Sequence, residues 1–474
     1  MKSELLKNAD EEVKKIIYEK IQDCYITGNI PNNFTISKLV TIPKKGNATE
    51  CANYRTLSLI SHTSKILLNI IKNRIKNKVE NNVDDDQFGF RLGKGIREAL
   101  LALRILLERR IDMNRSTYIA FVDIEKAFDN VNWKRLFKTM RQIGIDWRDR
   151  RIIFQLYKQQ KTQIEIKDVK KCALIRKGVR QGCSVSPLLF NIFIESAIKT
   201  FKERTKGVKV NGRQIHSMRF ANDIAIVAES ERDLSNMLTN LSIALEQVQL
   251  KINAKKTKIL IVDKNGKEMQ RTVNLHGTPI EEVKSFCYLG NHITQDNKYT
   301  TEIKRRIALA KQAFIKKQNL LTSRHLQIKI RKLFIKTYVW SVALYGSESW
   351  TLSTLDKKRI EAFEMWTWRK IMKISWRERK SNTEVLNLIK EPRQIIRMME
   401  IRKTKFFGHI MRHNTLITNI MEGKINGKRG RGRPRETNLG NLKKLLSLAS
   451  YEDMKRLADN REDWLKQQGQ AFRQ

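Results

Sequence analysis

The sequence is organised around Ser217-Met218-Arg219-Phe220-Ala221-Asn222-Asp223-Ile224-Ala225-Ile226-Val227-Ala228. Two apolar runs meet there at the polar pair Asn222 and Asp223, and short β-prone runs around a two-residue turn are typical of a β-hairpin. Asn and Asp tolerate the positive φ values that such a turn requires, so we expect both side chains at the tip. Taken alone, such a pair usually marks only a turn.

A second carboxylate ends another apolar run, Tyr118-Ile119-Ala120-Phe121-Val122-Asp123. A strand ending in Asp123 can place this side chain beside the hairpin tip, where both segments would hold divalent metal through hard oxygen ligands. This is the arrangement of a two-metal nucleotidyl transferase.

Charge is the strongest global property of the chain. The 474 residues include 94 Lys and Arg against 49 Asp and Glu, a formal net charge of +45. Such an excess repels itself unless a polyanion neutralises it, so we expect nucleic acid as the partner. A merely solvated basic surface is the alternative.

Other global features exclude several classes of protein. No run of about eighteen apolar residues is present, so no membrane span and no membrane partner are expected. The five cysteines are scattered without zinc-site spacing, which fits a reducing intracellular compartment.

Two basic or glycine-containing segments are candidates for binding a nucleotide. Lys44 and Arg55 flank a turn after the apolar run 35–43, and together they could clamp a triphosphate, although isolated Lys and Arg are usually ordinary surface charges. Gly182, next to Gln181, leaves room for a flat ligand such as a base pair, and a plain tight turn is the alternative.

The order of these segments resembles the reverse transcriptases of non-LTR (LINE-type) retrotransposons, of the insect and animal endonuclease-reverse transcriptase type. The likeness spans roughly residues 30 to 300, and two later segments continue it. The segments that carry it are Asn53-Tyr54-Arg55, Gln87-Phe88-Gly89-Phe90-Arg91, Ala127-Phe128-Asp129, Arg180-Gln181-Gly182-Cys183, Phe220-Ala221-Asn222-Asp223, Leu250-Lys251-Ile252-Asn253, Tyr288-Leu289-Gly290, Tyr345-Gly346-Ser347-Glu348-Ser349-Trp350 and Phe406-Phe407-Gly408-His409.

The resemblance implies an α/β (α+β) fold with a right-hand polymerase palm and fingers, a helical thumb and a basic, mostly helical C-terminal region. The expected divisions are an N-terminal helix and fingers (1–116), a palm (117–296), thumb-like helices (297–345), a basic Trp-rich helical region (346–426), a basic linker that resembles an AT-hook (427–436) and a C-terminal helical piece (437–474).

The resemblance also implies roles for individual residues. Asp123 and Asp223 would bind two magnesium ions, and Phe128 occupies the position whose bulk excludes a ribose 2′-hydroxyl. Among the remaining positions, Lys44, or alternatively Lys45, and Arg55 would hold the triphosphate, Gln181 and Gly182 would line the nucleotide and template pocket, and Lys256 would lie near the leaving pyrophosphate.

One position departs from the family pattern. Asn222 stands where the family has an aspartate that binds metal, so the site loses a full negative charge. The leading hypothesis is therefore an RNA-directed DNA polymerase, and the alternative is a catalytically impaired, nucleic-acid-binding remnant. A third possibility, an RNA-synthesising polymerase or intron maturase, fits Phe128 less well.

The expected partners are an RNA template, a DNA primer or target, and dNTPs. The family usually carries an upstream endonuclease, which we expect to be absent or supplied by a separate protein. Nuclear localisation follows only from the resemblance and the basic tail.

Basic residues outside the palm are candidates for contacts with nucleic acid. Lys304 and Arg305 lie on a basic helix that suits a thumb along a duplex, although a solvated face on a core helix fits equally well. Arg431 and Arg433 lie in the linker, whose extended basic chain can follow a narrow minor groove. The clustered tryptophans 340, 350, 366, 368 and 376 fit either a base-stacking surface or, more often, a core.

Overall fold

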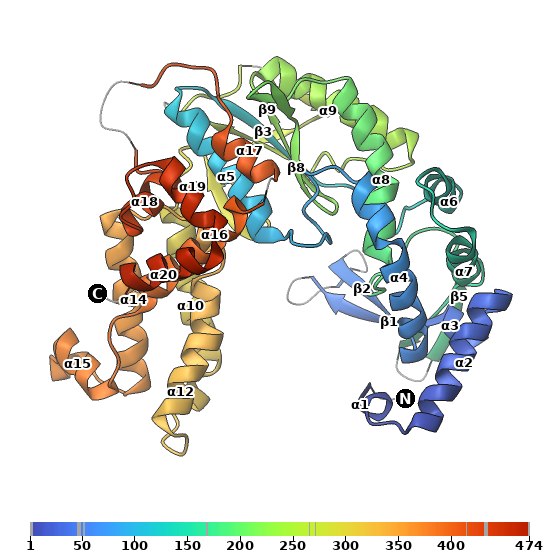
Figure 1. Ribbon diagram of the computed structural model, residues 1–474, viewed down its shortest axis with the longest axis horizontal. Helices are drawn as coiled ribbons and strands as arrows, with labels where there is room; N and C mark the ends of the chain where they lie inside the picture. Colours follow the sequence, from blue (N-terminus) through green and yellow to red (C-terminus); the bar gives the residue numbers. More distant parts are fainter. Residues whose placement is uncertain are drawn as a thin grey trace.

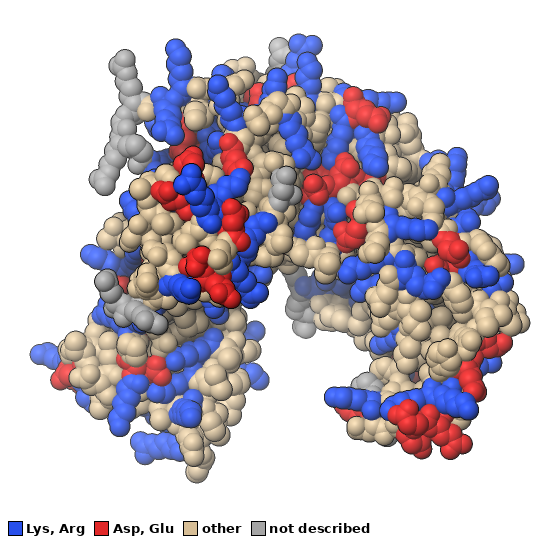
Figure 2. Space-filling view, viewed as in Figure 1, with Lys and Arg blue, Asp and Glu red and all other residues tan. Residues whose placement is uncertain are grey.

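The computed structural model describes residues 3–44, 49–50, 53–166, 169–264, 266–270, 272–413, 415–430 and 435–472. Two arms extend from a central body, and a hollow separates them (Figures 1 and 2). The predicted mixed α/β class with a reverse-transcriptase-like fold is confirmed. In this part of the chain, no helix combines the length and the apolar character needed to cross a bilayer.

The central body is built on a five-stranded sheet with the order β13-β10-β3-β9-β8. Strand β3 pairs antiparallel with both β9 and β10, and β8 and β9 form the predicted hairpin. This palm sheet consists of β3 (Thr117–Val122), β8 (Ser217–Phe220), β9 (Asp223–Ala228), β10 (Lys258–Val262) and β13 (Glu281–Glu282).

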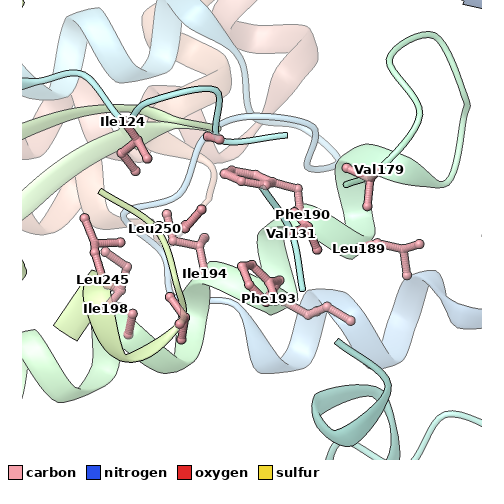
Figure 3. Packing of buried hydrophobic residues seen from close by; sticks show 14 of the residues in the cluster. Ile124, Val131, Val179, Leu189, Phe190, Phe193, Ile194, Ile198, Leu245 and Leu250 are labelled. Carbon is pink, nitrogen blue, oxygen red and sulfur yellow. The ribbon is translucent and has the colours of Figure 1, made fainter. Parts of the chain in front are cut away.

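Both faces of the palm sheet are covered, because its strands are apolar on both sides. Alternate residues of β3 belong to different cores: Ala120 and Val122 pack with α8 (Ser186–Glu203) and α9 (Glu231–Gln247), while Ile119 and Phe121 pack with α5 (Ile96–Asp112). Figure 3 shows the α8 side, where Phe190, Phe193 and Ile194 meet residues from several segments. Burying each such side chain stabilises the fold by about 1.5–3 kcal/mol.

The first arm is a fingers region. Its four-stranded sheet has the order β2-β1-β4-β5, in which only the β1–β4 pair is parallel. The strands are β1 (Ile36–Pro43), β2 (Tyr54–Leu59), β4 (Lys161–Ile166) and β5 (Val169–Leu174). The helices are α1 (Ser3–Lys7), α2 (Glu11–Thr27), α3 (Asn32–Thr35), α4 (His62–Asn82), α6 (Trp133–Gln142) and α7 (Trp147–Lys158). Buried residues of α2, α4, α6 and α7 belong to the same core as α8.

Three small hairpins complete the β-structure of the described residues. They are β6 (Val208–Val210) with β7 (Arg213–Ile215), β11 (Asn274–Leu275) with β12 (Thr278–Pro279), and β14 (Ser285–Tyr288) with β15 (Asn291–Thr294).

The second arm is helical and follows β15. One apolar cluster runs from Tyr299 to Met399, so the predicted boundary at 345/346 falls inside a single core. Its helices are α10 (Thr300–Lys316), α11 (Gln318–Leu321), α12 (Ile328–Phe334), a π-helical turn (Ile335–Val339), α13 (Trp340–Ala343), a 3-10 turn (Ser347–Ser349), α14 (Thr354–Ile371), a second 3-10 turn (Trp376–Glu378) and α15 (Asn382–Ile389).

The last helices return to the palm and form part of its core. Residues of α16 and α17 share a cluster with α5 and the outer face of the sheet, and Trp464 of α20 is buried in the same cluster. The predicted C-terminal helical piece therefore packs on the palm side. These helices are α16 (Ile395–Met411), α17 (Leu416–Glu422), α18 (Asn438–Leu445), α19 (Tyr451–Asp459) and α20 (Arg461–Ala471).

The tryptophan cluster is mainly core. Trp340, Trp350 and Trp368 are buried, and the rings of Trp340 and Trp368 lie 5.4 Å apart. Trp366 is partly buried against Phe314. Trp376 differs from the others, because 84% of it is exposed. The core interpretation therefore holds for the cluster except at Trp376.

Candidate active site

The β8–β9 hairpin carries the first candidate carboxylate. Phe220 pairs with Asp223, so Ala221 and Asn222 form the two-residue turn and Asp223 begins β9. Ala221 has the positive φ of 56° that the turn needs. We expected Asn222 or Asp223 to adopt this conformation. The positive φ instead falls on Ala221, whose backbone N–H is hydrogen-bonded to the side chain of Gln87.

The second carboxylate follows the central strand. Val122 pairs with Ile224, so Asp123 leaves β3 beside Asp223 at the start of β9. The backbone of Asp123 is fixed on the other side, because its N–H donates to the Thr257 hydroxyl (3.4 Å) and its carbonyl accepts from the Asn253 N–H (2.8 Å). Antiparallel pairing thus brings together two carboxylates that are a hundred residues apart in sequence.

The two carboxylates are electrostatically coupled. Crowding by surrounding protein raises the pKa of Asp223, and the negative charge of Asp123 raises it further, whereas Arg55 opposes the shift. Burial also raises the pKa of Asp123, whose Oδ2 lies 3.8 Å from the Nζ of Lys256. Because like charges close together favour a cation between them, this pair suits a divalent ion.

The candidate metal site has two carboxylates, and it lacks a third negatively charged ligand. Among the described residues, no group of three or more His, Cys, Asp and Glu side chains gathers at one point. The third oxygen at the turn belongs to the neutral amide of Asn222, which is partly exposed. Carboxylate and amide oxygens are ligands that magnesium accepts, so the residues fit such an ion with reduced charge compensation.

Two basic residues of the fingers lie near the carboxylates. Arg55 of β2 pairs with Ile42 of β1, and Lys44 follows β1, where its N–H donates to the Asn53 carbonyl at 2.8 Å. Both residues are exposed. The charge of Lys44 acts on Asp123, and that of Arg55 acts on Asp223. The antiparallel β1–β2 pair therefore brings two cations toward the palm carboxylates.

A loop of the palm docks against the same finger strand. The Ser58 N–H donates to the Gln181 carbonyl (2.9 Å), and the Gln181 side chain donates to the Asp129 carboxylate (3.4 Å). Gly182 has a φ of 99°, and a Cβ there would lie 2.9 Å from Leu57 Cδ1. Glycine is required at this position because a side chain meets both a positive φ and the finger strand.

Phe128 packs beneath the loop that contains Gln181 and Gly182. Its ring stacks on Phe190 of α8 at a centroid distance of 4.5 Å and an interplanar angle of 14°. The Phe128 carbonyl accepts from the Val179 N–H at 2.8 Å, which joins this residue to the segment that precedes Gln181. The ring is thus held in one orientation by palm residues.

The structure adds a residue whose role the sequence did not indicate. Gln87 is fully buried, and its side-chain oxygen accepts from the N–H groups of Ala221 and Gly89, both at 2.9 Å. A Cβ at Gly89 would lie 2.5 Å from the Ala221 nitrogen. The segment 86–89 therefore supports the turn that carries Asn222 and Asp223. In the sequence, Gln87 was part of a segment that carried the family resemblance, but no role was predicted for it.

A buried charge network lies behind the hairpin. The Arg219 guanidinium contacts the Asp86 carboxylate at 2.6 Å and the Glu195 carboxylate at 3.0 Å, and Lys202 lies 2.8 Å from Asp86. These cations hold the pKa of Asp86 well below its usual range, despite its burial. The network ties β8 to α8 and to the segment before Gln87.

The remaining predicted residues lie away from this centre. Lys304 is exposed on α10, but Arg305 is half-buried and donates to the Gly290 carbonyl (3.3 Å) and to Glu302. Arg305 therefore serves at least partly to fix α10 on the β14–β15 hairpin. Arg431 and Arg433, like Lys45, lie outside the described residues.

The fold and the site define a class of protein. A palm sheet whose antiparallel central strands present two carboxylates at adjacent strand ends, near the basic strands of a fingers region, is the framework of a nucleotidyl-transferring polymerase. The model of the family described as reverse transcriptase (RNA-dependent DNA polymerase) matches residues 42–293. The chain belongs to this family, and it is similar to Pol proteins of non-LTR retrotransposons. The family generally uses divalent metal ions.

Two curated relatives illustrate the similarity. The Pol polyprotein of the type-1 retrotransposable element R2 of Nasonia vitripennis is 27% identical over 61% of this chain and 27% of that protein. The corresponding protein of element R2DM of Drosophila melanogaster is 27% identical over 58% of this chain and 25% of its own length. The chain thus aligns with about a quarter of these relatives. Among solved structures, apo telomerase of Candida tropicalis aligns with a TM-score of 0.42 and 12% identity, covering 86% of this chain and 73% of that one.

Proposed function

We propose that this chain is an RNA-directed DNA polymerase of a non-LTR retrotransposon, which extends a DNA 3′-hydroxyl on an RNA template with dNTPs. The observation that carries the proposal is the placement of Asp123 beside Asp223, with Lys44 and Arg55 of the fingers near enough for their charges to act on these carboxylates. Family membership supports the same reaction.

Each group has a role in this reaction. Asp123 and Asp223 would hold two magnesium ions, with Asn222 as a neutral ligand. When bound, magnesium polarises the α-phosphate and increases the acidity of the primer hydroxyl.

The other side chains act on the nucleotide. Arg55 binds the triphosphate through paired hydrogen bonds, and Lys44 binds it as a point charge. Lys256, beside Asp123, faces the leaving pyrophosphate. Gln181 and Gly182 line the pocket of the nucleotide and template, and the stacked ring of Phe128 excludes a ribose 2′-hydroxyl.

The partners follow from the reaction and from the charge of +45. We infer that an RNA template and a DNA primer or target occupy the hollow between the arms, seen in Figure 2. Lys304 and Arg305 of α10, together with the linker that contains Arg431 and Arg433, would contact nucleic acid beyond the cleft. A separate endonuclease would create the primer end, and the reaction would take place in the nucleus.

A second candidate function is binding of nucleic acid without catalysis. Asn222 favours it, because an amide in place of a carboxylate removes one negative charge from the metal site. Metal stabilisation contributes about several kcal/mol to transfer reactions of this kind, so the rate of this chain could fall by orders of magnitude.

Primer extension on a primed RNA template with magnesium and dNTPs tests both functions. The natural protein is compared with Asn222→Asp and Asp123→Ala. We expect Asn222→Asp to extend faster than the natural protein and Asp123→Ala to be inactive. Extension by the natural protein establishes the polymerase. Extension by Asn222→Asp alone indicates an impaired copy whose function is binding, and extension by Asp123→Ala would overturn the site.

A further inference from the structure

A group of basic residues gathers at the end of the palm sheet opposite to the catalytic carboxylates. Thr117 at the start of β3 pairs with Val262 at the end of β10, so Arg115 and Lys264 extend beyond the same edge. Asp123 leaves the other end of β3. Six residues at about 3.3 Å each place the two ends about 20 Å apart.

The described residues that follow α17, up to Gly430, pass over this end of the sheet (Figure 1). A Cβ at Gly427 would lie 2.7 Å from the Met113 carbonyl oxygen and 3.5 Å from Arg115 Cγ, so the backbone packs directly on the end of α5. Gly430 approaches the Lys264 ammonium, because a Cβ there would lie 3.1 Å from its Nζ.

Further hydrogen bonds join this region to the segment that follows β15. Arg435 donates to the Asp296 carbonyl at 3.1 Å, and the Asp263 N–H donates to the Gln295 carbonyl at 3.0 Å. An open cavity of about 490 Å³ remains here, and it is lined by Met113, Asn114, Arg115, Gly427 and Lys428.

Three separate segments contribute cations to this surface, which we call the far-end basic patch. All of its members are exposed: Arg115, Lys264, Lys267, Lys428, Arg429 and Arg435. Lys267 belongs to it because its ammonium lies 5.7 Å from the ring centre of Tyr118, the second residue of β3.

The acidic residues of this region are partly engaged within the protein. Asp263 accepts from the Ser116 hydroxyl at 2.6 Å, and Asp296 accepts from the Thr294 hydroxyl and the Lys298 N–H. Asp112 is only partly exposed. Glu268 and Glu436, which follow Lys267 and Arg435, are exposed. The six exposed cations outnumber these two carboxylates, in agreement with the basic side chains at the upper left of Figure 2.

We propose that the far-end basic patch is a second nucleic-acid site, which binds a run of backbone phosphates outside the catalytic cleft. Converging Lys and Arg side chains around a glycine-containing backbone suit phosphates without reading sequence. The patch lies at the opposite end of β3 from Asp123, so the bound segment is not the primer end that reacts. A duplex DNA or a folded RNA could supply the phosphates.

Binding measurements test the patch independently of catalysis. The triple variant Lys264→Gln, Lys267→Gln, Lys428→Gln is compared with Lys134→Gln, Arg135→Gln, Lys138→Gln, which removes three exposed charges from α6. Affinity for a 30-base-pair DNA and for a hairpin RNA is measured over a series of salt concentrations. The thermal unfolding of both variants verifies folding, and a second patch variant, Arg115→Gln with Arg429→Gln, repeats the test on other residues.

We expect the patch variants to bind at least one of the two nucleic acids about tenfold more weakly than the α6 variant does. The slope of log affinity against log salt should fall by up to about 2.7 for three lost phosphate contacts. A loss confined to DNA or to RNA identifies the source of the phosphates. Equal losses in the patch and α6 variants would overturn the proposal, because general charge would then explain binding.

A catalytic control separates this proposal from the proposed function. The control uses Arg115→Gln, Lys264→Gln, Lys267→Gln, which leaves the linker 427–436 unchanged. Extension of a short, saturating primer–template by this variant should match that of the protein from which it is made. A parallel loss of extension would place the patch in the catalytic path and contradict a separate site. Because binding needs no chemistry, the patch is testable even if no variant polymerises.

Discussion

The side chain of Gln87 forms two hydrogen bonds with the backbone of Ala221, the residue with positive φ in the turn that leads to Asp223. Its oxygen accepts from the Ala221 N–H at 2.9 Å, and its amide nitrogen donates to the Ala221 carbonyl at 3.4 Å. A non-glycine residue with φ of 56° persists only where its surroundings fix it. Gln87 is therefore a positioning residue for the Asn222–Asp223 pair.

Replacing Gln87 with Leu should slow primer extension about 100-fold, because displacement of a catalytic group by about 1 Å has effects of this size. The variant leaves the N–H groups of Ala221 and Gly89 without their acceptor and should lose about 1–3 kcal/mol of stability. Single-turnover extension measures the first effect and urea denaturation the second, in the natural or the Asn222→Asp protein, whichever is active. A stability loss with an unchanged rate would show that Gln87 is only structural.

Replacing Phe128 with Val should relax selection against ribonucleotides. The Phe128 ring is held by stacking on Phe190, so its bulk is fixed rather than movable. Opening the pocket for one hydroxyl should change the ratio of ribonucleotide to deoxyribonucleotide incorporation by roughly 10- to 100-fold. Competition between the two nucleotides in primer extension measures this ratio. A proportional loss of both activities would instead indicate damage to the floor of the site.

The proximity of Asp123 and Asp223 could be predicted, because each follows or begins an apolar run and such runs pair as neighbouring strands. Apolar runs that end in Asp123 and Asp223 become adjacent strands, so one hairpin and one strand suffice to bring the carboxylates together. The exact turn could not be predicted. Its positive φ lies on Ala221 because Gln87, 134 residues away, supports the backbone there.

The rest of the fold depends on contacts that no local pattern contains. In the sequence, nothing distinguishes Arg219 from the many other basic residues. In the structure it is completely buried between Asp86 and Glu195. Gly408 lies in a segment of recognisable sequence, but its structural reason is Trp464, whose ring a Cβ would meet at 2.5 Å. Contacts of this kind, between residues distant in sequence, hold the C-terminal helices against the palm.

Replacing Arg219 with Met should destabilise the protein by roughly 3–5 kcal/mol, because it leaves the carboxylates of Asp86 and Glu195 buried without their main partner. The matched control is Lys14→Met, which removes an exposed pair with Glu11 at 2.7 Å and should cost less than about 1 kcal/mol. Urea denaturation of both variants provides the comparison. Similar losses would mean that the Arg219 network contributes no more than a surface ion pair.

Trp368 and Trp376 should differ sharply in their contribution to stability. Trp368 is fully buried beside Trp340, so Trp368→Ala should cost roughly 3–5 kcal/mol. Trp376 is 84% exposed, so Trp376→Ala should change stability by less than about 0.5 kcal/mol. Thermal and urea unfolding measure both. A large loss at Trp376 would show that this part of the helical arm packs more tightly than the structure indicates.

Glu108 should make stability decrease as pH rises toward neutrality. Its carboxylate accepts from the Asn438 N–H and from the Asn438 side-chain amide, both at 3.0 Å, and so joins α5 to the start of α18. Burial raises the pKa of Glu108 from 4.5 to about 7, although Asn438 and the charge of Lys403 oppose the shift. Between these values the folded state binds more protons than the unfolded state.

The favourable contribution of protonated Glu108 is therefore complete below about pH 4.5 and is lost as the pH rises through about 7. Glu108→Gln cannot titrate, so the stability of the natural protein relative to this variant should fall by up to about 3 kcal/mol across that interval. Urea denaturation of both proteins at several pH values gives the difference directly. Measurements stay below pH 8, because burial lowers the pKa of Lys403 to about 8 and its effect has the opposite sign above that pH. Parallel stability curves for the two proteins would show that the folded-state pKa of Glu108 is not raised.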